Sequence, residues 1–228
     1  MQELNIVVVD NEIETTSILS LYLTREGYQV FTADSGITAL QLIHDIRPDL
    51  IILDILLRDL DGLEVCKEVR KTSNVPIMFL SSKNKDEDII HGLTIGADDY
   101  MTKPFSPSQL VARVKAHLRR QQQHPHLNHH LLSYPGLEID RRSYTVKVDG
   151  SIISLSCKEF DLLCHLAESP NKVFKLEHLY QLIWNSDSFG DTRTLMVHIS
   201  NLRKKIEKDP ANPRYILTVR GVGYKFSY

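Results

Sequence analysis

The chain has 228 residues, of which 42% are hydrophobic and 25% are charged; these values are typical of globular proteins, and the length allows two domains. No apolar run approaches the roughly 20 residues that a membrane span requires, and the N-terminus carries no apolar signal segment, which argues against an integral membrane or exported protein. We therefore expect a cytoplasmic protein without a membrane partner.

The net charge of −2 conceals two parts of opposite sign. Residues 1–135 carry 13 Lys and Arg against 18 Asp and Glu, whereas residues 136–228 carry 14 against 11. A basic part joined to an acidic part makes a polyanion a candidate partner for the second part. The three cysteines, Cys66, Cys157 and Cys164, have no CxxC spacing and are expected to be reduced core thiols.

Residues 4–120 alternate short apolar runs with amphipathic stretches. The apolar runs, which predict strands, are residues 4–10, 28–33, 49–54, 75–81 and 98–103. The amphipathic stretches, which predict helices, are residues 15–27, 36–48, 62–72, 86–97 and 106–120. Five strands alternating with five helices predict an α/β domain whose parallel sheet is covered by helices on both faces.

A polar segment, "QQQHPHLNHHLLSYP", follows at residues 121–135 and is interpreted as a linker. It contains four histidines, His124, His126, His129 and His130. A metal site or pH sensor is one interpretation of this cluster, and a solvated linker is the other, which we favour because no acidic or cysteine partners accompany the histidines.

The remainder of the chain has a different pattern. Residues 136–156 alternate polar and apolar side chains around an Asp-Gly pair, which predicts a small antiparallel sheet. Helical stretches are predicted at residues 157–169, 175–185 and 191–208, and two short β segments at the end of the chain surround the sequence "RGVG". This part is therefore predicted to be an α+β domain.

Polar side chains follow four of the five strands predicted in the first part. Asp10 and Asp54 each end an apolar run, Ser81 ends a third, and Lys103 follows the last. The carboxyl ends of the strands of a doubly wound sheet meet in one crevice. Two carboxylates there suit Mg²⁺, and a carboxylate beside such a metal can accept a phosphoryl group. The hydroxyl and the lysine are then expected to bind the phosphoryl oxygens.

With these motifs in view, the chain resembles bacterial two-component response regulators of the OmpR/PhoB family. The segments "VVVDNE", "LIILDILLRDLDG", "PIMFLSSK" and "GADDYMTKPFSP" are similar to the receiver domain, and "RTLMVHISNLRKKI" and "TVRGVGYKF" are similar to the winged-helix effector domain. The segment "GLTIGADDYMTKPF" is also loosely similar to vancomycin-resistance-type regulators. The resemblance implies a flavodoxin-like receiver at residues 1–120, a linker at 121–135, and a winged helix-turn-helix DNA-binding domain at 136–228.

The resemblance also implies roles for residues of the crevice. Asp54 would be the phosphoacceptor, Ser81 and Tyr100 the switch residues, and Lys103 the partner of the phosphoryl group. The Lys103–Pro104 peptide bond is expected to be cis. The implied Mg²⁺ ligands are Asp10, Asn11, Asp54 and the backbone carbonyl of Leu56.

Two positions of the receiver depart from the family's pattern. Asn11 stands where a carboxylate is usual, which puts the strength of Mg²⁺ binding in doubt. Arg58 stands where a proline is usual after the phosphoacceptor, which affects the stiffness of the turn.

The receiver's predicted dimer face contains the charged residues Asp98, Asp99, Arg113, Lys115 and Arg120. Ile89, Thr94 and Gln109 stand where other charged partners are usual, so fewer ion pairs and more apolar contact are expected there.

Residues 191–208 place Leu195, Ile199, Leu202 and Ile206 on one helical face, which predicts a buried stripe and a polar, basic remainder. Such a helix fits recognition of a DNA major groove. The candidate DNA contacts are Arg193, Thr194, His198, Asn201, Arg203, Lys204 and, in the predicted wing, Arg220. Arg203 is the first candidate for a base contact and Asn201 the second, because both can form bidentate hydrogen bonds with bases.

We therefore expect a transcription factor, not an enzyme, that a sensor histidine kinase phosphorylates on Asp54 and that then dimerises and binds direct repeats in promoter DNA. RNA polymerase is an implied partner, through residues 184–191. One alternative is a phosphorylation-independent regulator whose receiver serves only for dimerisation, which Asn11 favours. The other is an aspartyl-phosphate hydrolase, which Leu56 disfavours because such phosphatases carry a second Asp at that position.

Overall fold

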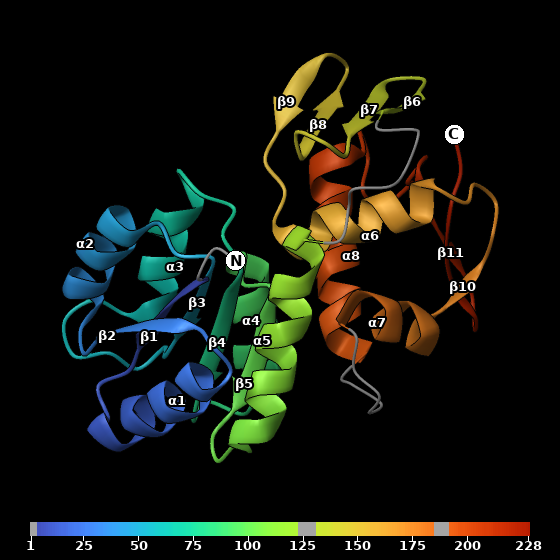
Figure 1. Ribbon diagram of the computed structural model, residues 1–228. Helices are drawn as coiled ribbons and strands as arrows, with labels where there is room; N and C mark the ends of the chain where they lie inside the picture. The colour runs from blue at the N-terminus through green and yellow to red at the C-terminus, as the bar shows by residue number, and fades with distance from the viewer. Residues whose placement is uncertain (1–3, 123–130, 185–191) are drawn as a thin grey trace. The chain divides into compact units, whose positions relative to one another are not determined.

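The computed structural model describes residues 4–122, 131–184 and 192–228, and of residues 119–122 only the backbone (Figure 1). The chain divides into two compact units, Met1–Arg119 and Arg120–Tyr228. The predicted linker histidines and most of the segment predicted to meet RNA polymerase lie outside the described residues.

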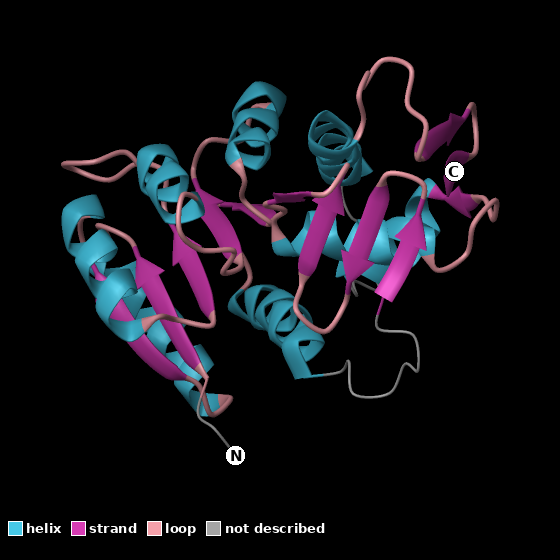
Figure 2. Ribbon diagram, turned by 90° about the horizontal axis from the view of Figure 1, so that it is seen from above, coloured by secondary structure: helices cyan, strands magenta, loops and turns pink. Residues whose placement is uncertain are grey.

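The first unit is built on a parallel five-stranded sheet in the order β2-β1-β3-β4-β5. Figure 2 shows strands of this sheet, in magenta, with helices beside them. The strands are β1 (Asn5–Val9), β2 (Gln29–Ala33), β3 (Leu50–Leu53), β4 (Ile77–Ser81) and β5 (Asp99–Thr102). The helices are α1 (Ile13–Arg25), α2 (Gly36–Ile46), α3 (Gly62–Arg70), α4 (Asp86–Ile95) and α5 (Pro107–Gln122). The predicted α/β class and the alternation of five strands with five helices are confirmed.

Helices cover both faces of this sheet, which is why its central strands are apolar without interruption. Alternate residues of β1, such as Ile6 and Val8, pack with side chains of α1 and α5. On the opposite face Phe79 of β4 lies against Gly92 of α4. The strand order reverses between β1 and β3, so the crevice beyond their carboxyl ends is the expected ligand site.

In residues 131–184 and 192–228, the second unit has two antiparallel sheets and three helices. A four-stranded sheet contains β6 (Leu131–Tyr134), β7 (Leu137–Asp140), β8 (Thr145–Val148) and β9 (Ser151–Ile153). The helices are α6 (Cys157–Ala167), α7 (Leu176–Trp184) and α8 (Thr192–Ile206). A three-stranded sheet in the order β10-β12-β11 contains β10 (Phe174–Lys175), β11 (Ile216–Val219) and β12 (Gly223–Phe226). Together these elements form a winged-helix domain.

Two details of this unit bear on the sequence predictions. The Asp149-Gly150 turn has positive φ at both residues, 47° and 83°, as a two-residue hairpin between β8 and β9 requires. Strand β6 occupies residues that the polar composition assigned to the linker; it forms because β7 offers it a paired edge from Leu131 opposite Asp140 to Tyr134 opposite Leu137.

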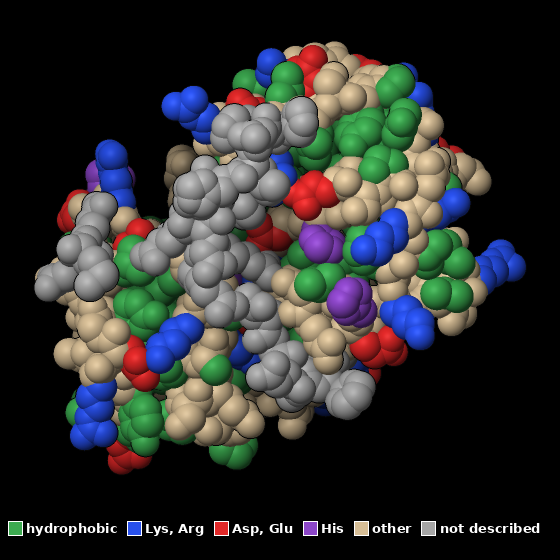
Figure 3. Space-filling model, turned by 45° about the vertical axis from the view of Figure 1, so that its right-hand side comes forward, with side chains coloured by type: hydrophobic (Ala, Val, Ile, Leu, Met, Phe, Trp, Pro, Cys, Tyr) green, Lys and Arg blue, Asp and Glu red, His purple; other side chains and the backbone are tan. Residues whose placement is uncertain are grey.

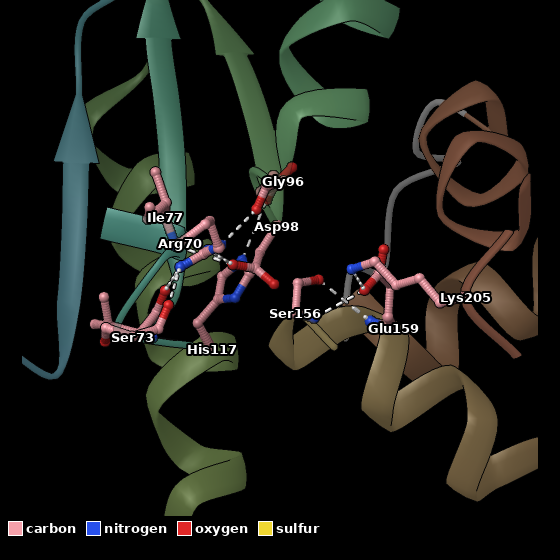
Figure 4. Close-up of polar contacts among 11 residues, drawn as sticks. Arg70, Ser73, Ile77, Gly96, Asp98, His117, Ser156, Glu159 and Lys205 are labelled. Atoms are coloured by element: carbon pink, nitrogen blue, oxygen red, sulfur yellow. Dashed lines mark hydrogen bonds and ion pairs between the residues drawn. The ribbon is translucent and has the colours of Figure 1, made fainter. Parts of the chain in front are cut away.

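The buried stripe predicted on α8 is confirmed, since Leu195, Ile199, Leu202 and Ile206 are each at most 1% exposed. Helix α6 begins with a capping box between Ser156 and Glu159 (Figure 4). The Glu159 carboxylate also accepts a hydrogen bond from Lys205 at 2.6 Å, which ties α6 to α8. Among the described residues, no helix is both long and apolar enough to cross a lipid bilayer.

Candidate functional site

Two carboxylates lie side by side at the point where the strand order reverses. Val9 and Leu53 are register partners in β1 and β3, so the residues that follow them, Asp10 and Asp54, leave the sheet as neighbours. Both are buried, at 2% and 4% exposure. The Lys103 ammonium lies 2.8 Å from one oxygen of each carboxylate, so the structure brings these three predicted residues together.

Backbone N–H groups orient both carboxylates toward the Lys103 ammonium group. The Asp10 Oδ1 atom accepts the Glu12 N–H at 2.9 Å, and the Asp54 Oδ1 atom accepts the Leu56 N–H at 3.0 Å. Each carboxylate therefore has one oxygen fixed by its own turn, and the other oxygen, Oδ2, is the atom that contacts Lys103. The rotamers of both side chains are thus set by local backbone donors and not by the lysine alone.

The charges of this cluster are unbalanced. Glu12 also contacts the Lys103 ammonium, at 3.0 Å, so three carboxylates share one cation. Burial raises the pKa of Asp10, against the opposing effects of Lys103 and the Glu12 N–H. Burial alone would lower the pKa of Lys103, but its hydrogen bonds to Asp10, Asp54 and Glu12 raise it. The lysine is therefore fully charged at neutral pH, and a surplus of negative charge remains for a second cation.

The donors present fit Mg²⁺. Within residues 4–122, 131–184 and 192–228, no three His, Cys, Asp or Glu side chains are grouped as a metal site. Mg²⁺ needs no such group, because it binds through one or two carboxylates and keeps several waters. Asp10 and Asp54 supply those carboxylates. Asn11, partly exposed, directly follows Asp10, and Leu56, exposed, lies two residues after Asp54.

The predicted switch residues are neighbours as well. Ser81 is fully buried at the end of β4, and the Tyr100 hydroxyl donates a hydrogen bond to the Lys83 carbonyl oxygen at 2.8 Å. The Tyr100 ring is 8% exposed and meets the Phe79 ring edge-on, with the centroids 6.0 Å apart. Burial raises the pKa of Tyr100 to about 12, and the Ser81 hydroxyl acts in the opposite direction.

Gly92 of α4 provides the space that the Tyr100 ring occupies. A Cβ atom at this position would lie 3.2 Å from Cε2 of Tyr100 and 3.1 Å from Cδ2 of Phe79. Both distances are shorter than an ordinary carbon–carbon contact of about 3.5–4.0 Å. Its role could not be predicted from the sequence, because it depends on packing against side chains of two different strands, Phe79 of β4 and Tyr100 of β5.

Two residues of the predicted dimer face, Asp98 and Lys115, have partners within the receiver. Asp98 is fully buried: its Oδ2 atom accepts hydrogen bonds from Nη2 of Arg70 at 2.7 Å and from the Ile77 N–H at 3.0 Å (Figure 4). It therefore stabilises the packing of α3 on the sheet. Lys115 pairs with Glu26 at the end of α1, at 2.6 Å. Two residues along a helix correspond to about 200°, so Lys115 cannot share a face with Arg113.

The remaining residues of this face form a cluster around Asp99. Asp99 is 1% exposed, and both of its oxygens lie 2.9 Å from Nη1 of Arg113. His117, one turn further along α5, lies 3.5 Å from the same carboxylate. Burial opposes the charge of Asp99, but Arg113 and His117 lower its pKa far below its usual range. The side chain of Arg120 lies outside the described residues.

Arg203, the first candidate for a base contact, is occupied within its own domain. Its Nε and Nη2 atoms donate to the Ile216 carbonyl oxygen at 2.9 and 2.6 Å, and Nη2 also donates to the Thr218 hydroxyl at 2.9 Å. The guanidinium carbon lies 5.6 Å from the centre of the Tyr224 ring. Arg203 therefore joins α8 to the β11–β12 hairpin, and a contact with a base would require these hydrogen bonds to break.

Three other predicted DNA contacts form a buried row beside the core stripe of α8. Thr194, His198 and Asn201 are 4%, 1% and 6% exposed. The His198 ring lies 5.4 Å from the Trp184 ring of α7. The sequence contained this signal, because the three residues are four and three positions apart and each directly precedes a residue of the buried stripe, so they form a row that flanks it.

The exposed row of α8 contains Arg193, Met196, Ser200 and Lys204. Met196 and Ser200 were not among the predicted contacts. Arg220 is exposed at the turn between β11 and β12, beside Gly221, whose φ is 72°. On the molecular face drawn in Figure 3, Lys and Arg side chains are scattered and not gathered into one patch.

The comparisons with known proteins agree with both units. The chain matches the response regulator receiver domain over residues 6–115 and the C-terminal domain of transcriptional regulatory proteins over residues 150–226. Among solved structures, a RitR mutant is 30% identical with a TM-score of 0.80, and the alignment covers 98% of this chain and 99% of that one. DrrB of Thermotoga maritima, described as an OmpR/PhoB homolog, is 34% identical over all of both chains, with a TM-score of 0.53.

A third relative is described as belonging to a family of redox sensors in the streptococci that evolved from two-component response regulators. It is 31% identical, with a TM-score of 0.50 over 98% of this chain and 99% of that one.

Gly92→Ala is expected to displace the Tyr100 ring, because the added methyl group would lie within 3.3 Å of two aromatic rings. Fluorine NMR of protein labelled with fluorotyrosine, with Tyr100→Phe to assign the signal, would measure the change. Thr94→Ala, on the exposed side of the same helix, is the control and should leave the signal in place. An unchanged Tyr100 signal in Gly92→Ala would contradict the assigned role.

Arg203→Ala is expected to lower the free energy of unfolding of the effector domain by about 2 kcal/mol, because it removes charged hydrogen bonds to β11. Lys204→Ala should leave that stability unchanged and reduce the slope of log K for DNA against log salt by about one, as loss of one phosphate contact does. Chemical unfolding and DNA titrations at several salt concentrations measure both effects. If Arg203→Ala left the stability unchanged and reduced the salt slope, Arg203 would be a DNA contact.

Proposed function

Because the chain belongs to the OmpR/PhoB family of two-component transcriptional response regulators, we propose that phosphorylation of Asp54 by a sensor histidine kinase switches its binding to promoter DNA. The observation that carries this proposal is the Lys103 ammonium, 2.8 Å from both the Asp10 and the Asp54 carboxylates. A carboxylate held beside a cation, in a site that also offers metal ligands, is suited to accept a phosphoryl group.

Each residue of the site has a separate role in the transfer of the phosphoryl group to Asp54. An Asp54 oxygen attacks the phosphorus of a phosphohistidine, the phosphorus–nitrogen bond breaks, and the imidazole leaves with the electron pair of that bond. Asp10, Asp54, the Asn11 amide and the Leu56 carbonyl would hold Mg²⁺, which would supply positive charge to neutralise the phosphoryl oxygens. Lys103 pairs with one phosphoryl oxygen, and the Ser81 hydroxyl donates to another.

The phosphoryl group then acts by shifting an equilibrium between two conformations. Ser81 moves toward the phosphoryl group, and Tyr100 follows because its hydroxyl bonds to the backbone of Lys83, two residues after Ser81. Asp99 is coupled to this movement, since its carboxylate accepts the Tyr100 N–H at 2.8 Å. The face around Asp99 and Arg113 then forms a receiver dimer, which brings two winged helices to adjacent direct repeats.

In the effector domain, the exposed row of α8 is the surface that enters the major groove. Arg193 and Lys204 are suited to phosphates, and Arg220 at the wing to the minor groove. Met196 and Ser200 are then the side chains nearest the base edges, where an apolar group can contact the thymine methyl.

A phosphorylation-independent regulator remains the second candidate function. Asn11 favours it, and so does the similarity to redox sensors described as having evolved from response regulators. The burial of Cys66 and Cys164 argues against a regulator that senses oxidants through these thiols. Burial raises the pKa of both thiols, and that of Cys66 to about 11. Such thiols are poorly reactive.

The first prediction of this proposal concerns Asn11. We expect a small phosphodonor to label Asp54 in a Mg²⁺-dependent reaction, and Asn11→Asp to lower the Mg²⁺ midpoint by about one to two powers of ten. Two unit charges about 4 Å apart at an effective dielectric of 20 interact by about 4 kcal/mol, which desolvation and screening reduce. Asp54→Asn is the control and should not be labelled.

The outcomes of this titration separate the two candidate functions. No labelling of the natural protein at saturating Mg²⁺ would favour the phosphorylation-independent regulator. Identical midpoints for the natural protein and Asn11→Asp would show that position 11 does not ligate the metal directly.

The second prediction concerns the dimer face. Arg113→Glu should prevent phosphodonor-dependent dimerisation, because it places a second carboxylate beside Asp99, and adding Asp99→Arg should restore part of it. Lys115→Glu, which lies about 200° away on α5, is the matched control and should dimerise normally. Sedimentation velocity measures all three variants, after thermal unfolding has shown that each is folded. An undisturbed dimer in Arg113→Glu would rule this face out.

A further inference from the structure

The loop between β3 and α3, residues 54–61, carries both the phosphoacceptor and the Leu56 carbonyl. Within it, the Leu56 N–H donates to the Asp54 carboxylate at 3.0 Å and the Leu57 N–H to the Ile55 carbonyl oxygen at 3.1 Å; the N–H of Gly62, the first residue of α3, donates to the same carbonyl oxygen at 2.9 Å. Arg58 provides no backbone restraint of the kind that a proline's fixed φ supplies. The stiffness of this loop must therefore come from contacts outside it.

Asp59 provides such a contact. Its Oδ1 atom accepts the Gly36 N–H at 2.8 Å and its Oδ2 atom accepts the Ile37 N–H at 3.1 Å. These are N–H groups of the first turn of α2, which have no partner inside the helix. The hydrogen bonds from Ile37 and neighbouring backbone N–H groups lower the pKa of Asp59 to about 2, so the carboxylate stays charged at any physiological pH.

Gly36 shows independently that the loop and α2 are in close contact. A Cβ atom at this position would lie 2.5 Å from the Leu60 carbonyl oxygen and 2.8 Å from the Leu60 Cβ atom. At the other end of the loop, a Cβ atom on Gly62 would lie 2.1 Å from the Asp54 carbonyl oxygen. The loop is thus held between two positions where only glycine fits, with the Asp59 carboxylate bridging to the first.

We infer that Asp59 is a positioning residue, which clamps the phosphoacceptor loop to the N-terminus of α2 and so holds the Leu56 carbonyl and the Asp54 carboxylate in place for a divalent cation. The clamp supplies the stiffness that Arg58, in place of the usual proline, does not. This inference rests on the proposed function, because it assigns the loop's rigidity to the metal site of the receiver.

Ser35 offers a matched control at the same end of the same helix. Its hydroxyl accepts the Thr38 N–H at 3.3 Å, so it caps α2 without bonding to the loop. Ser35→Ala therefore weakens the first turn of α2 and leaves the Asp59 bridge to the loop in place. Comparison of Ser35→Ala with Asp59→Ala separates an effect on the loop from an effect on the helix.

The experiment is a titration of the full-length protein with Mn²⁺, followed by electron paramagnetic resonance, which needs no phosphorylation. Asp59→Ala should weaken Mn²⁺ binding by about tenfold, as loss of a residue that orients metal ligands commonly does. Ser35→Ala should bind Mn²⁺ as the natural protein does, even if both variants lower the melting temperature. Adding Arg58→Pro to Asp59→Ala should recover part of the affinity, because proline restricts the loop directly.

Several results would overturn the inference. These are equal Mn²⁺ affinity in Asp59→Ala and the natural protein, an equal loss in Ser35→Ala, or no Mn²⁺ binding by the natural protein. A tenfold loss in Asp59→Ala together with no labelling of Asp54 by a phosphodonor would leave the clamp standing and refute only the proposed phosphorylation.

Discussion

The arrangement of carboxylates in the acidic crevice depends on their ion pairs with the Lys103 ammonium group. It lies 2.8 Å from two buried carboxylates that belong to different strands, and 3.0 Å from a third that is exposed. Removing one partner of a buried ion pair generally costs about 3–5 kcal/mol, because the remaining charge has lost its counterion. Without the lysine, Asp10 and Asp54 would repel each other at the end of adjacent strands, so their juxtaposition is stable only while a cation lies between them.

The same lysine directly follows β5 and connects the crevice to the neighbouring strand, β4. Its backbone N–H donates to the Ser81 carbonyl oxygen at 2.9 Å, so the residue that contacts Asp54 is also bonded to the neighbouring strand. Three residues earlier, Tyr100 points toward α4, while Asp99 before it contacts Arg113 and His117 of α5. Successive side chains of a strand point to opposite faces, so β5 contacts both helices of the predicted dimer face within two residues. A small displacement of this strand therefore reaches α4 and α5 together.

Most of the fold and the centre of the site could be predicted from the sequence, because they depend on local periodicity. Apolar runs that end in Asp10 and Asp54 are sufficient to place both at one sheet edge, since parallel strands share their carboxyl ends. The buried hydrogen bond between Asp98 and Arg70 could not be predicted, because residue type does not distinguish Asp98 from Asp99. For Lys115 the sequence did contain the relevant signal, because two residues along a helix correspond to about 200° and so separate it from Arg113. The structure shows that it pairs with Glu26 of the turn after α1.

Arg203 illustrates a limit that periodicity cannot overcome. A long side chain beside the buried stripe of α8 can extend outward to DNA or bend back onto its own domain, and its place on the helical wheel is the same in both cases. The choice depends on the Ile216 carbonyl and the Thr218 hydroxyl, which strand β11 presents within 2.9 Å of the guanidinium. Through these bonds Arg203 fixes α8 to the β11–β12 hairpin. These bonds connect the helix that carries the exposed cations Arg193 and Lys204 to the hairpin whose turn carries Arg220, as the proposed contact with two grooves of one duplex would require.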